Sequence, residues 1–206
     1  HELETALWLE SDRMGYLLGL LNEKSLANQI DVVRNERRQR YDNVPYGLER
    51  FAVAKALYPE GHPYRYLTIG KHEDLESASV DDVKAFFQTW YVPSNATLLL
   101  AGDFEIAEAK AMIDKWFGTF PKLAKPAHVE PPTPKLERNH REVIDDPFAR
   151  LRRIHWVWHS PEDLGAGDLE LRVVGDVLGA EGWGHLQQRL VEKEKIAQSV
   201  WVYQDG

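Results

Sequence analysis

The histidines His155 and His159 are four residues apart in the stretch "HWVWH", the closest histidine spacing in the sequence. On a helix this spacing would place both imidazoles on one face, where they could bind one metal ion. The aromatic and β-branched neighbours favour a strand instead, in which the two imidazoles lie about 13 Å apart. We therefore interpret both histidines as structural residues, with Ile154, Trp156 and Trp158 on the opposite face of the strand.

Glu36 is the second residue with chemical potential, because it stands among four arginines in "VVRNERRQRYDN". A glutamate in a protein can bind a metal ion or serve as a general base. On a helix, however, Glu36 also has Arg40 one turn further along, and such a pair stabilises a helix only weakly. The chemistry of the stretch alone favours this second interpretation, a surface residue in an ion pair.

Several other kinds of catalytic site have no support in the sequence. The chain has no cysteine, which excludes disulfides, cysteine-ligated zinc and thiol nucleophiles. The stretch "GAGD" lacks the spacing of a phosphate-binding loop, and no Gly-x-Ser-x-Gly motif is present. His62, His72, Glu73 and Asp74 occur near turn signals, and we interpret them as loop charges or turn caps.

The composition is that of a folded, acidic protein. Of the 206 residues, 43% are hydrophobic and 28% are charged, and the net charge is −8. This charge argues against nucleic acid as a partner. No apolar run reaches the roughly 18 residues of a membrane span. The chain begins without Met and in the middle of a helical pattern, so we interpret it as a fragment of a longer protein.

The hydrophobic pattern before residue 121 predicts mainly helices. The second helix should begin with Ser25 as its N-cap, and another should begin at Ser79 with Asp81 and Asp82 in its first turn. The predicted helices cover about 1–20, 25–42, 46–58, 79–91 and 105–120, and a buried strand is predicted at 95–104.

A proline-rich stretch divides the chain. Residues 121–134 contain five prolines, which indicates an extended linker. Beyond it the pattern predicts strands at 140–146, 151–160 and 197–204, and helices near 168–180 and 184–195. The expected fold class is therefore α+β, with mixed sheet layers covered by helices, in two parts joined by the linker.

Five segments in order carry a resemblance to a known family: "LWLESDRMG", "VVRNERRQRYDNVPYG", "HPYRYLTIGKHEDL", "FFQTWYVPSNATLLLAGDF" and "LQQRLVEKEKIAQSV". Together they resemble the pitrilysin/insulinase family of inverzincin zinc peptidases, which includes the mitochondrial processing peptidase, and within it the short bacterial members. The family's zinc ligands are two histidines of a His-x-x-Glu-His motif and a distant glutamate, and the motif glutamate is the general base. The resemblance places the distant glutamate at Glu36 and implies Zn²⁺ as the cofactor of the full-length protein.

This chain departs from the family pattern at three places. It contains no His-x-x-Glu-His motif, so the resemblance implies no catalytic residue in this chain and no zinc bound to the fragment alone. Gln29 stands where many members carry a second glutamate that supports catalysis. Val191 and Gln198 stand where the family's non-zinc half carries an Arg/Tyr pair that binds substrate.

The resemblance also implies an organisation and a function. Residues 1–120 would be the later part of a zinc-bearing peptidase domain, 121–139 the linker and 140–206 the opening part of a second, similar domain. The full-length protein would be a zinc endopeptidase that cleaves peptides or small unfolded proteins, while the fragment would be inactive and its open sheet edges prone to association. A homologous subunit would supply the Arg/Tyr pair, or the protein would form a homodimer. The alternative is a non-catalytic scaffold or partner subunit of the same family. The compartment would be the bacterial periplasm or cytoplasm, with the periplasm favoured.

Overall fold

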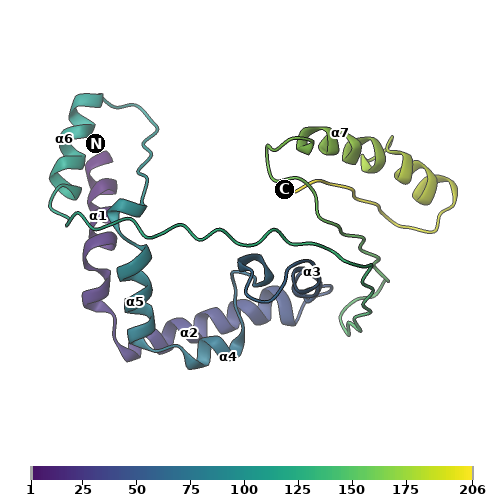
Figure 1. The fold of residues 1–206 in the computed structure, drawn as a ribbon, viewed down its shortest axis with the longest axis horizontal. Coiled ribbons are helices and arrows are strands. Elements are labelled where there is room, and N and C mark those ends of the chain that lie inside the picture. The colour runs from purple at the N-terminus through teal and green to yellow at the C-terminus, as the bar shows by residue number, and fades with distance from the viewer. Residues whose placement is uncertain (1, 206) are drawn as a thin grey trace.

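The computed structural model describes residues 2–205, which form helices joined by long extended segments (Figure 1). The α-helices of this part of the chain are α1 (Leu3–Leu20), α2 (Glu23–Arg37), α3 (Glu49–Leu57), α4 (His72–Ser77), α5 (Val80–Trp90), α6 (Ile106–Phe117) and α7 (Asp168–Gly179). Short 3₁₀ turns η2 (Pro63–Arg65) and η3 (Pro93–Asn95) and the π-helical turns η1 (Arg38–Asp42) and η4 (Gln187–Lys193) complete the regular structure.

The predicted α+β fold with mixed sheet layers is wrong for residues 2–205, where the structure contains no β-strand. The four segments predicted as strands, 95–104, 140–146, 151–160 and 197–204, are irregular, and no backbone hydrogen bond joins two of them. A strand is stable only as part of a hydrogen-bonded ladder, and these segments have no such partner. Many of their apolar side chains are exposed as a result, for example Leu99 at 87% and Trp156 at 80%.

The predicted helices are confirmed in position. At α5 the predicted cap is also confirmed, because the Ser79 hydroxyl accepts a hydrogen bond from the Asp82 amide and the Asp82 carboxylate accepts one from the Ser79 amide. The predicted cap of α2 is wrong, because Asn22 is its N-cap. Ser25 occupies the third helical position, where it completes the reciprocal capping box with Asn22.

The helix that carries Glu36 changes its hydrogen-bonding pattern near its end. Residues Glu23–Arg37 are α-helical, and Arg38–Asp42 continue as the π-helical turn η1, so the helical segment ends at Asp42 as predicted. Single π-turns within helices are rare and occur frequently at functional sites. The helix predicted near 184–195 is also π-helical, in η4.

The packed interior is small. In the described part of the chain, the buried apolar side chains are Leu7, Ala54, Val80, Val92 and Ala109. A compact protein of this mass exposes about 9,800 Å² of surface, on the usual relation between area and mass. This chain exposes 16842 Å², and many of its large apolar side chains are among the exposed residues.

The helices form separate groups along the linker (Figure 1). Helix α1 packs on α6, with the Lys115 ammonium 2.6 Å from the Glu4 carboxylate, and α4 lies against α2. The linker of residues 121–139 contains no helix and crosses from the α6 end of the molecule to the region of α3. Beyond it, α7 and the C-terminal segment lie side by side.

Candidate functional site

The site begins with Glu36, the last but one residue of α2. Its side chain is 41% exposed, and its carboxylate pairs with the Arg40 guanidinium of η1 at 3.1 Å. The Arg40 side chain is largely exposed, at 72%, so water screens this pair and either partner can leave it readily. The carboxylate is therefore accessible to an additional ligand.

Two other arginines of the same stretch hold the end of α2 in place. Arg34 pairs with Glu76 of α4 at 3.1 Å. Arg37 donates a hydrogen bond to the carbonyl of Gly70, and its guanidinium lies 4.6 Å from the centre of the Phe51 ring of α3. Because these contacts come from two different elements, the last turn of α2 is fixed between α3 and α4.

Asp42, at the end of η1, completes this arrangement. Its carboxylate lies 3.4 Å from the Arg37 guanidinium and 3.1 Å from the His72 imidazole at the start of α4. His72, predicted to be a loop charge or turn cap, thus contacts the π-turn directly. No local sequence pattern predicts this contact, because its partners are thirty residues apart.

The other positions at which the resemblance finds a departure from the family pattern do not gather around Glu36. Gln29 lies on α2 two turns earlier, about 10.5 Å along the helix axis, and is exposed. Val191 lies in η4 and Gln198 in the segment that follows it. Both belong to the region of α7 and the C-terminus, which Figure 1 shows well apart from α2.

Glu36 fits the chemistry of a zinc ligand, since a carboxylate oxygen is a common donor to zinc and this one is accessible. It does not form a complete site here. Within residues 2–205, no group of three or more His, Asp or Glu side chains is arranged to hold a metal ion. The other ligands that the resemblance implies are therefore not supplied by the part of the chain that the structure describes.

His155 and His159 both point toward α3. The His155 imidazole contacts the Glu49 carboxylate, and His159 Nε2 lies 2.9 Å from the carbonyl oxygen of Leu57. The large apolar side chains next to these histidines remain exposed, namely Ile154, Trp156 and Trp158. The predicted division into two faces is therefore present, although the segment is not a strand.

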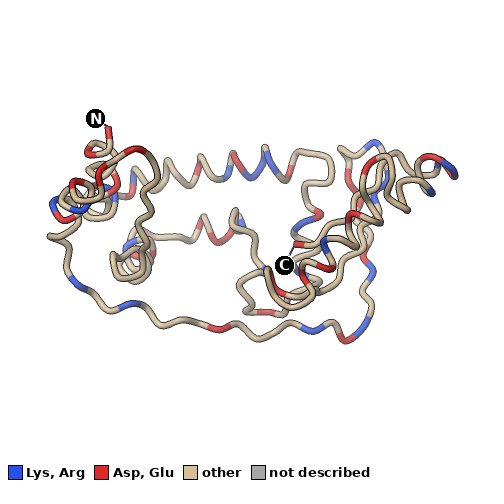
Figure 2. The backbone as a smooth tube through the Cα atoms, turned by 90° about the horizontal axis from the view of Figure 1, so that it is seen from above, with Lys and Arg blue, Asp and Glu red and all other residues tan. Residues whose placement is uncertain are grey.

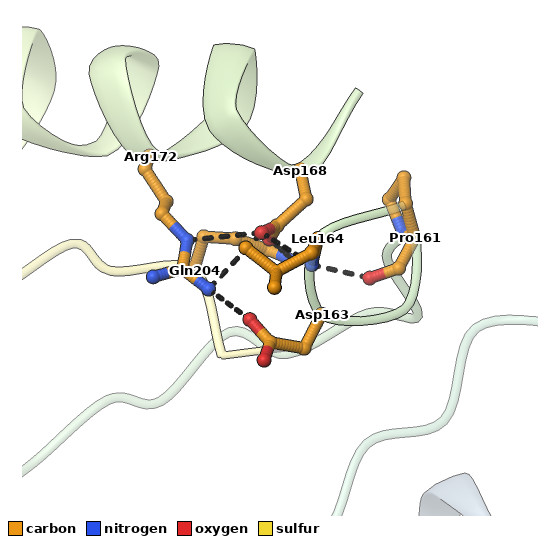
Figure 3. Close-up of polar contacts among 6 residues, drawn as sticks. All are labelled: Pro161, Asp163, Leu164, Asp168, Arg172 and Gln204. Atoms are coloured by element: carbon orange, nitrogen blue, oxygen red, sulfur yellow. Dashed lines mark hydrogen bonds and ion pairs between the residues drawn. The ribbon is translucent and has the colours of Figure 1, made fainter. Parts of the chain in front are cut away.

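A second polar cluster surrounds Asp168 at the first position of α7 (Figure 3). Its side chain is fully buried, and its carboxylate accepts hydrogen bonds from the Leu164 amide at 3.0 Å, Arg172 at 3.1 Å and Gln204 at 3.1 Å. Burial raises the pKa of this carboxyl, but the three hydrogen bonds and the Arg172 charge outweigh burial and lower the pKa below its ordinary value. Asp168 therefore holds the start of α7 to the C-terminal segment.

The "GAGD" stretch lies at this cluster. It forms the turn before α7, with Gly167 at a φ of 93°. Because the Asp168 carboxylate occupies the amino end of the helix, a phosphate group there would meet a negative charge. The cluster thus connects the start of α7 to the C-terminal segment and is not arranged to bind a phosphate group.

Both signs of charge occur throughout residues 2–205. Figure 2 shows Lys and Arg interspersed with Asp and Glu along the backbone. In the same residues, no helix combines the length and apolar character needed to cross a membrane.

Comparison with known proteins identifies the family. Residues 77–206 match the sequence profile described as the peptidase M16 inactive domain. The zinc protease PqqE of Helicobacter pylori is 28% identical over 204 residues, which cover 95% of this chain and 44% of that protein. The uncharacterized zinc protease YmxG of Bacillus subtilis is 24% identical over 182 residues, covering 88% of this chain and 43% of that protein.

A solved structure agrees with these sequence matches. The crystal structure of a protease from Helicobacter pylori superposes with a TM-score of 0.78 at 25% identity, covering 99% of this chain and 50% of that chain. The chain thus spans about half the length of the relatives it matches. On the strength of the profile match, this chain belongs to the peptidase M16 family, the pitrilysin/insulinase-like zinc peptidases that its sequence resembles.

Proposed function

We propose that this chain is part of a longer zinc-dependent endopeptidase that cleaves peptides or small unfolded proteins, with Glu36 as one zinc ligand. Two relatives are named zinc proteases, and both are about twice as long as this chain. These relatives support zinc-dependent cleavage of peptides as the class of reaction. The accessible position of Glu36 at the end of α2 supports its role as a zinc ligand.

The observation that carries the proposal is the contrast between Glu36 and the arginines around it. Arg34 and Arg37 hold the helix end against α4 and α3, whereas within residues 2–205 the Glu36 carboxylate pairs only with the exposed Arg40. A metal ligand needs a fixed backbone and an available oxygen, and Glu36 has both. Zinc, when bound, would lower the pKa of a bound water to about 7 and so supply the nucleophile.

The remaining parts of the site would come from elsewhere. Two further ligands and a general base would lie on the rest of the longer polypeptide. The groups that bind substrate opposite the zinc would come from a homologous partner subunit or from a second copy of the protein. The exposed area of 16842 Å² supports such additional surfaces, because it leaves apolar faces of this chain uncovered.

The test is the substitution Glu36→Gln in the longer polypeptide, with zinc content measured after dialysis. We expect the variant to lose its zinc, because an amide oxygen is neutral and binds zinc more weakly than a carboxylate. Arg40→Ala is the matched control. It removes the exposed partner of Glu36, and zinc content should stay unchanged. Equal zinc content in Glu36→Gln and the unsubstituted protein would contradict the assignment.

The isolated chain offers a second measurement. Because residues 2–205 present no complete metal-binding group, residues 1–206 alone should bind zinc only weakly and show no peptidase activity. Tight binding of one zinc ion per chain in a calorimetric titration would show that these residues form a complete site, and the division of ligands proposed above would be wrong.

The competing candidate is a non-catalytic scaffold or partner subunit. It is favoured by the profile match, which is to an inactive domain and covers residues 77–206, a range that does not include Glu36. The two candidates differ in metal content. A scaffold subunit would be purified without stoichiometric zinc and would lose no function in the Glu36→Gln variant.

A further inference from the structure

Tyr46, in the loop between η1 and α3, is held by residues from the far side of the linker. Its amide donates a hydrogen bond to the Asp146 carboxylate at 2.5 Å, and its hydroxyl donates one to the carbonyl of Leu151 at 2.8 Å. The Arg153 guanidinium lies 3.7 Å from the centre of the Tyr46 ring. These partners are 100 or more residues away in the sequence. We call the set of Tyr46, Asp146, Leu151 and Arg153 the Tyr46 clamp.

The backbone of Tyr46 shows that the clamp constrains the loop. Tyr46 has a φ of 62°, in the left-handed region that is unfavourable for a residue with a large side chain. Residues in such conformations persist only where the surroundings hold them there. The clamp supplies that support by fixing the amide, the ring and the hydroxyl of Tyr46 at once.

Asp146 is the centre of the clamp on the linker side. Besides the Tyr46 amide, its carboxylate accepts hydrogen bonds from the amides of Phe148 at 2.8 Å and Ala149 at 3.0 Å. The hydrogen bond from Tyr46, more than the other two, lowers the pKa of the Asp146 carboxyl below its ordinary value, against the effect of burial. The carboxylate is therefore charged at neutral pH and shared between both sides of the linker.

A short series of contacts joins the clamp to the helix that carries Glu36. Gly47, next to Tyr46, packs so closely on the carbonyl of Tyr41 in η1 that a side chain there would overlap it. The Tyr41 ring contacts the Phe51 ring of α3, with 5.2 Å between the ring centroids. The Arg37 guanidinium lies over the same Phe51 ring, 4.6 Å from its centre. Arg37 is the residue next to Glu36. The clamp and the last turn of α2 thus share one packed unit.

We propose that Tyr46 is a positioning residue for Glu36, and that the segment beyond the linker, through Asp146, Leu151 and Arg153, sets the orientation of the end of α2. This inference rests on the proposed function, because it concerns the zinc ligand. It adds that the two sides of the linker are coupled, so that a change at residues 146–153 alters zinc binding on the other side of the linker without contacting the metal.

The experiment uses three clamp variants of the longer polypeptide. Asp146→Ala removes the acceptor of the Tyr46 amide, Asp146→Asn keeps an oxygen acceptor there, and Tyr46→Phe removes only the hydroxyl. Asp145→Ala is the matched control, with the same change of charge one residue away on an exposed side chain. The measurements are the zinc dissociation constant, the urea midpoint of the metal-free protein, and amide hydrogen exchange of residues 38–43.

We expect Asp146→Ala to weaken zinc binding by about two- to thirty-fold, the usual range for coupling between distant sites. Tyr46→Phe should weaken it less, and Asp146→Asn should restore most of the loss. In the metal-free protein, Asp146→Ala should speed hydrogen exchange in residues 38–43 and leave α6 unchanged. Asp145→Ala should match the unsubstituted protein in every measurement.

Two results would overturn the inference. If Asp146→Ala only lowers the urea midpoint, while zinc affinity and the exchange of residues 38–43 stay unchanged, the clamp is a structural joint without influence on Glu36. The proposed function would then stand, provided that Glu36→Gln still loses zinc. If Glu36→Gln itself keeps zinc with unchanged affinity, the proposed function fails and this inference fails with it.

Discussion

The contact between α7 and the C-terminal segment leads to a quantitative prediction at Gly179. A β-carbon built on Gly179 would lie 2.6 Å from the backbone nitrogen of Val202 and 2.9 Å from its β-carbon. These distances are shorter than van der Waals contact, and one neighbour is backbone, which cannot rotate away. The substitution Gly179→Ala should therefore force α7 and the C-terminal segment apart.

The magnitude follows from a comparison with two other glycines in helices. At Gly19, near the end of α1, a β-carbon would meet no atom within 4 Å, so Gly19→Ala should gain about 0.5–1 kcal/mol from helix propensity. At Gly175 the nearest atom would be the Val202 oxygen at 3.4 Å, an ordinary contact, so Gly175→Ala should be close to neutral or slightly stabilising. Gly179→Ala gains a similar propensity term and loses about 1–3 kcal/mol to overpacking. The difference between Gly179→Ala and Gly19→Ala should thus be about 1–3 kcal/mol.

The assay is urea unfolding of the three variants and the unsubstituted chain, followed by tryptophan fluorescence and, for α7 itself, by hydrogen exchange. We expect the order of stability to be Gly19→Ala above Gly175→Ala above Gly179→Ala. If Gly179→Ala is as stable as Gly19→Ala, the C-terminal segment does not lie against α7 in solution, and the packing described above is wrong at this place.

Two further predictions concern the end of α2 and the Asp168 cluster. Arg37→Ala should lower the free energy of unfolding by about 1.5–3 kcal/mol, because it removes a charged hydrogen bond to the Gly70 carbonyl and leaves that acceptor unpaired. Arg38→Ala, at an exposed position, is the control and should change the free energy of unfolding by less than about 0.5 kcal/mol in the same urea titration. Because the pKa of Asp168 is lowered in the folded chain, its contribution to stability is present above the unfolded pKa of about 4 and is lost as pH falls through the folded pKa. The urea midpoint of Asp168→Asn should therefore fall less steeply than that of the unsubstituted chain below about pH 4, and parallel pH profiles for the two proteins would show that Asp168 is not the group responsible.

The features that the sequence predicted well are those that depend on neighbouring residues. The Ser79 cap with Asp82 needs only three residues of chain, and the helical repeat of α6 is contained in α6 itself. The proline-rich stretch also predicts its own extended form, because each proline fixes its backbone angle locally. The α2 cap was misplaced by three residues because Asn22 and Ser25 are both good caps, and the structure uses both in one box.

The predicted strands failed for a different reason. Their composition predicts extended backbone correctly, since segments such as 151–160 are not helical, but it also predicts a buried face that the structure does not contain. A strand, however, also requires a partner at the right distance, and the sequence of one segment does not contain that information. In residues 2–205 the partner is missing, so the apolar faces of these segments stay exposed.

The candidate site shows the same difference between local features and contacts that join distant residues. Glu36 is predicted to be a zinc ligand from resemblance alone, because its local chemistry describes only the pair with Arg40, which the structure also contains. The contacts that hold its helix could not be predicted, because they join distant positions. Arg37 meets Gly70 at a separation of 33 residues, and Tyr46 meets Asp146 at a separation of 100.

The most direct test of the account is to locate the metal itself. Crystals of the longer polypeptide loaded with zinc should give an anomalous difference peak at the zinc absorption edge about 2.0–2.2 Å from a carboxylate oxygen of Glu36. A zinc peak elsewhere, with the Glu36 carboxylate still paired to Arg40 and not in contact with the metal, would contradict the assignment of Glu36 as a zinc ligand.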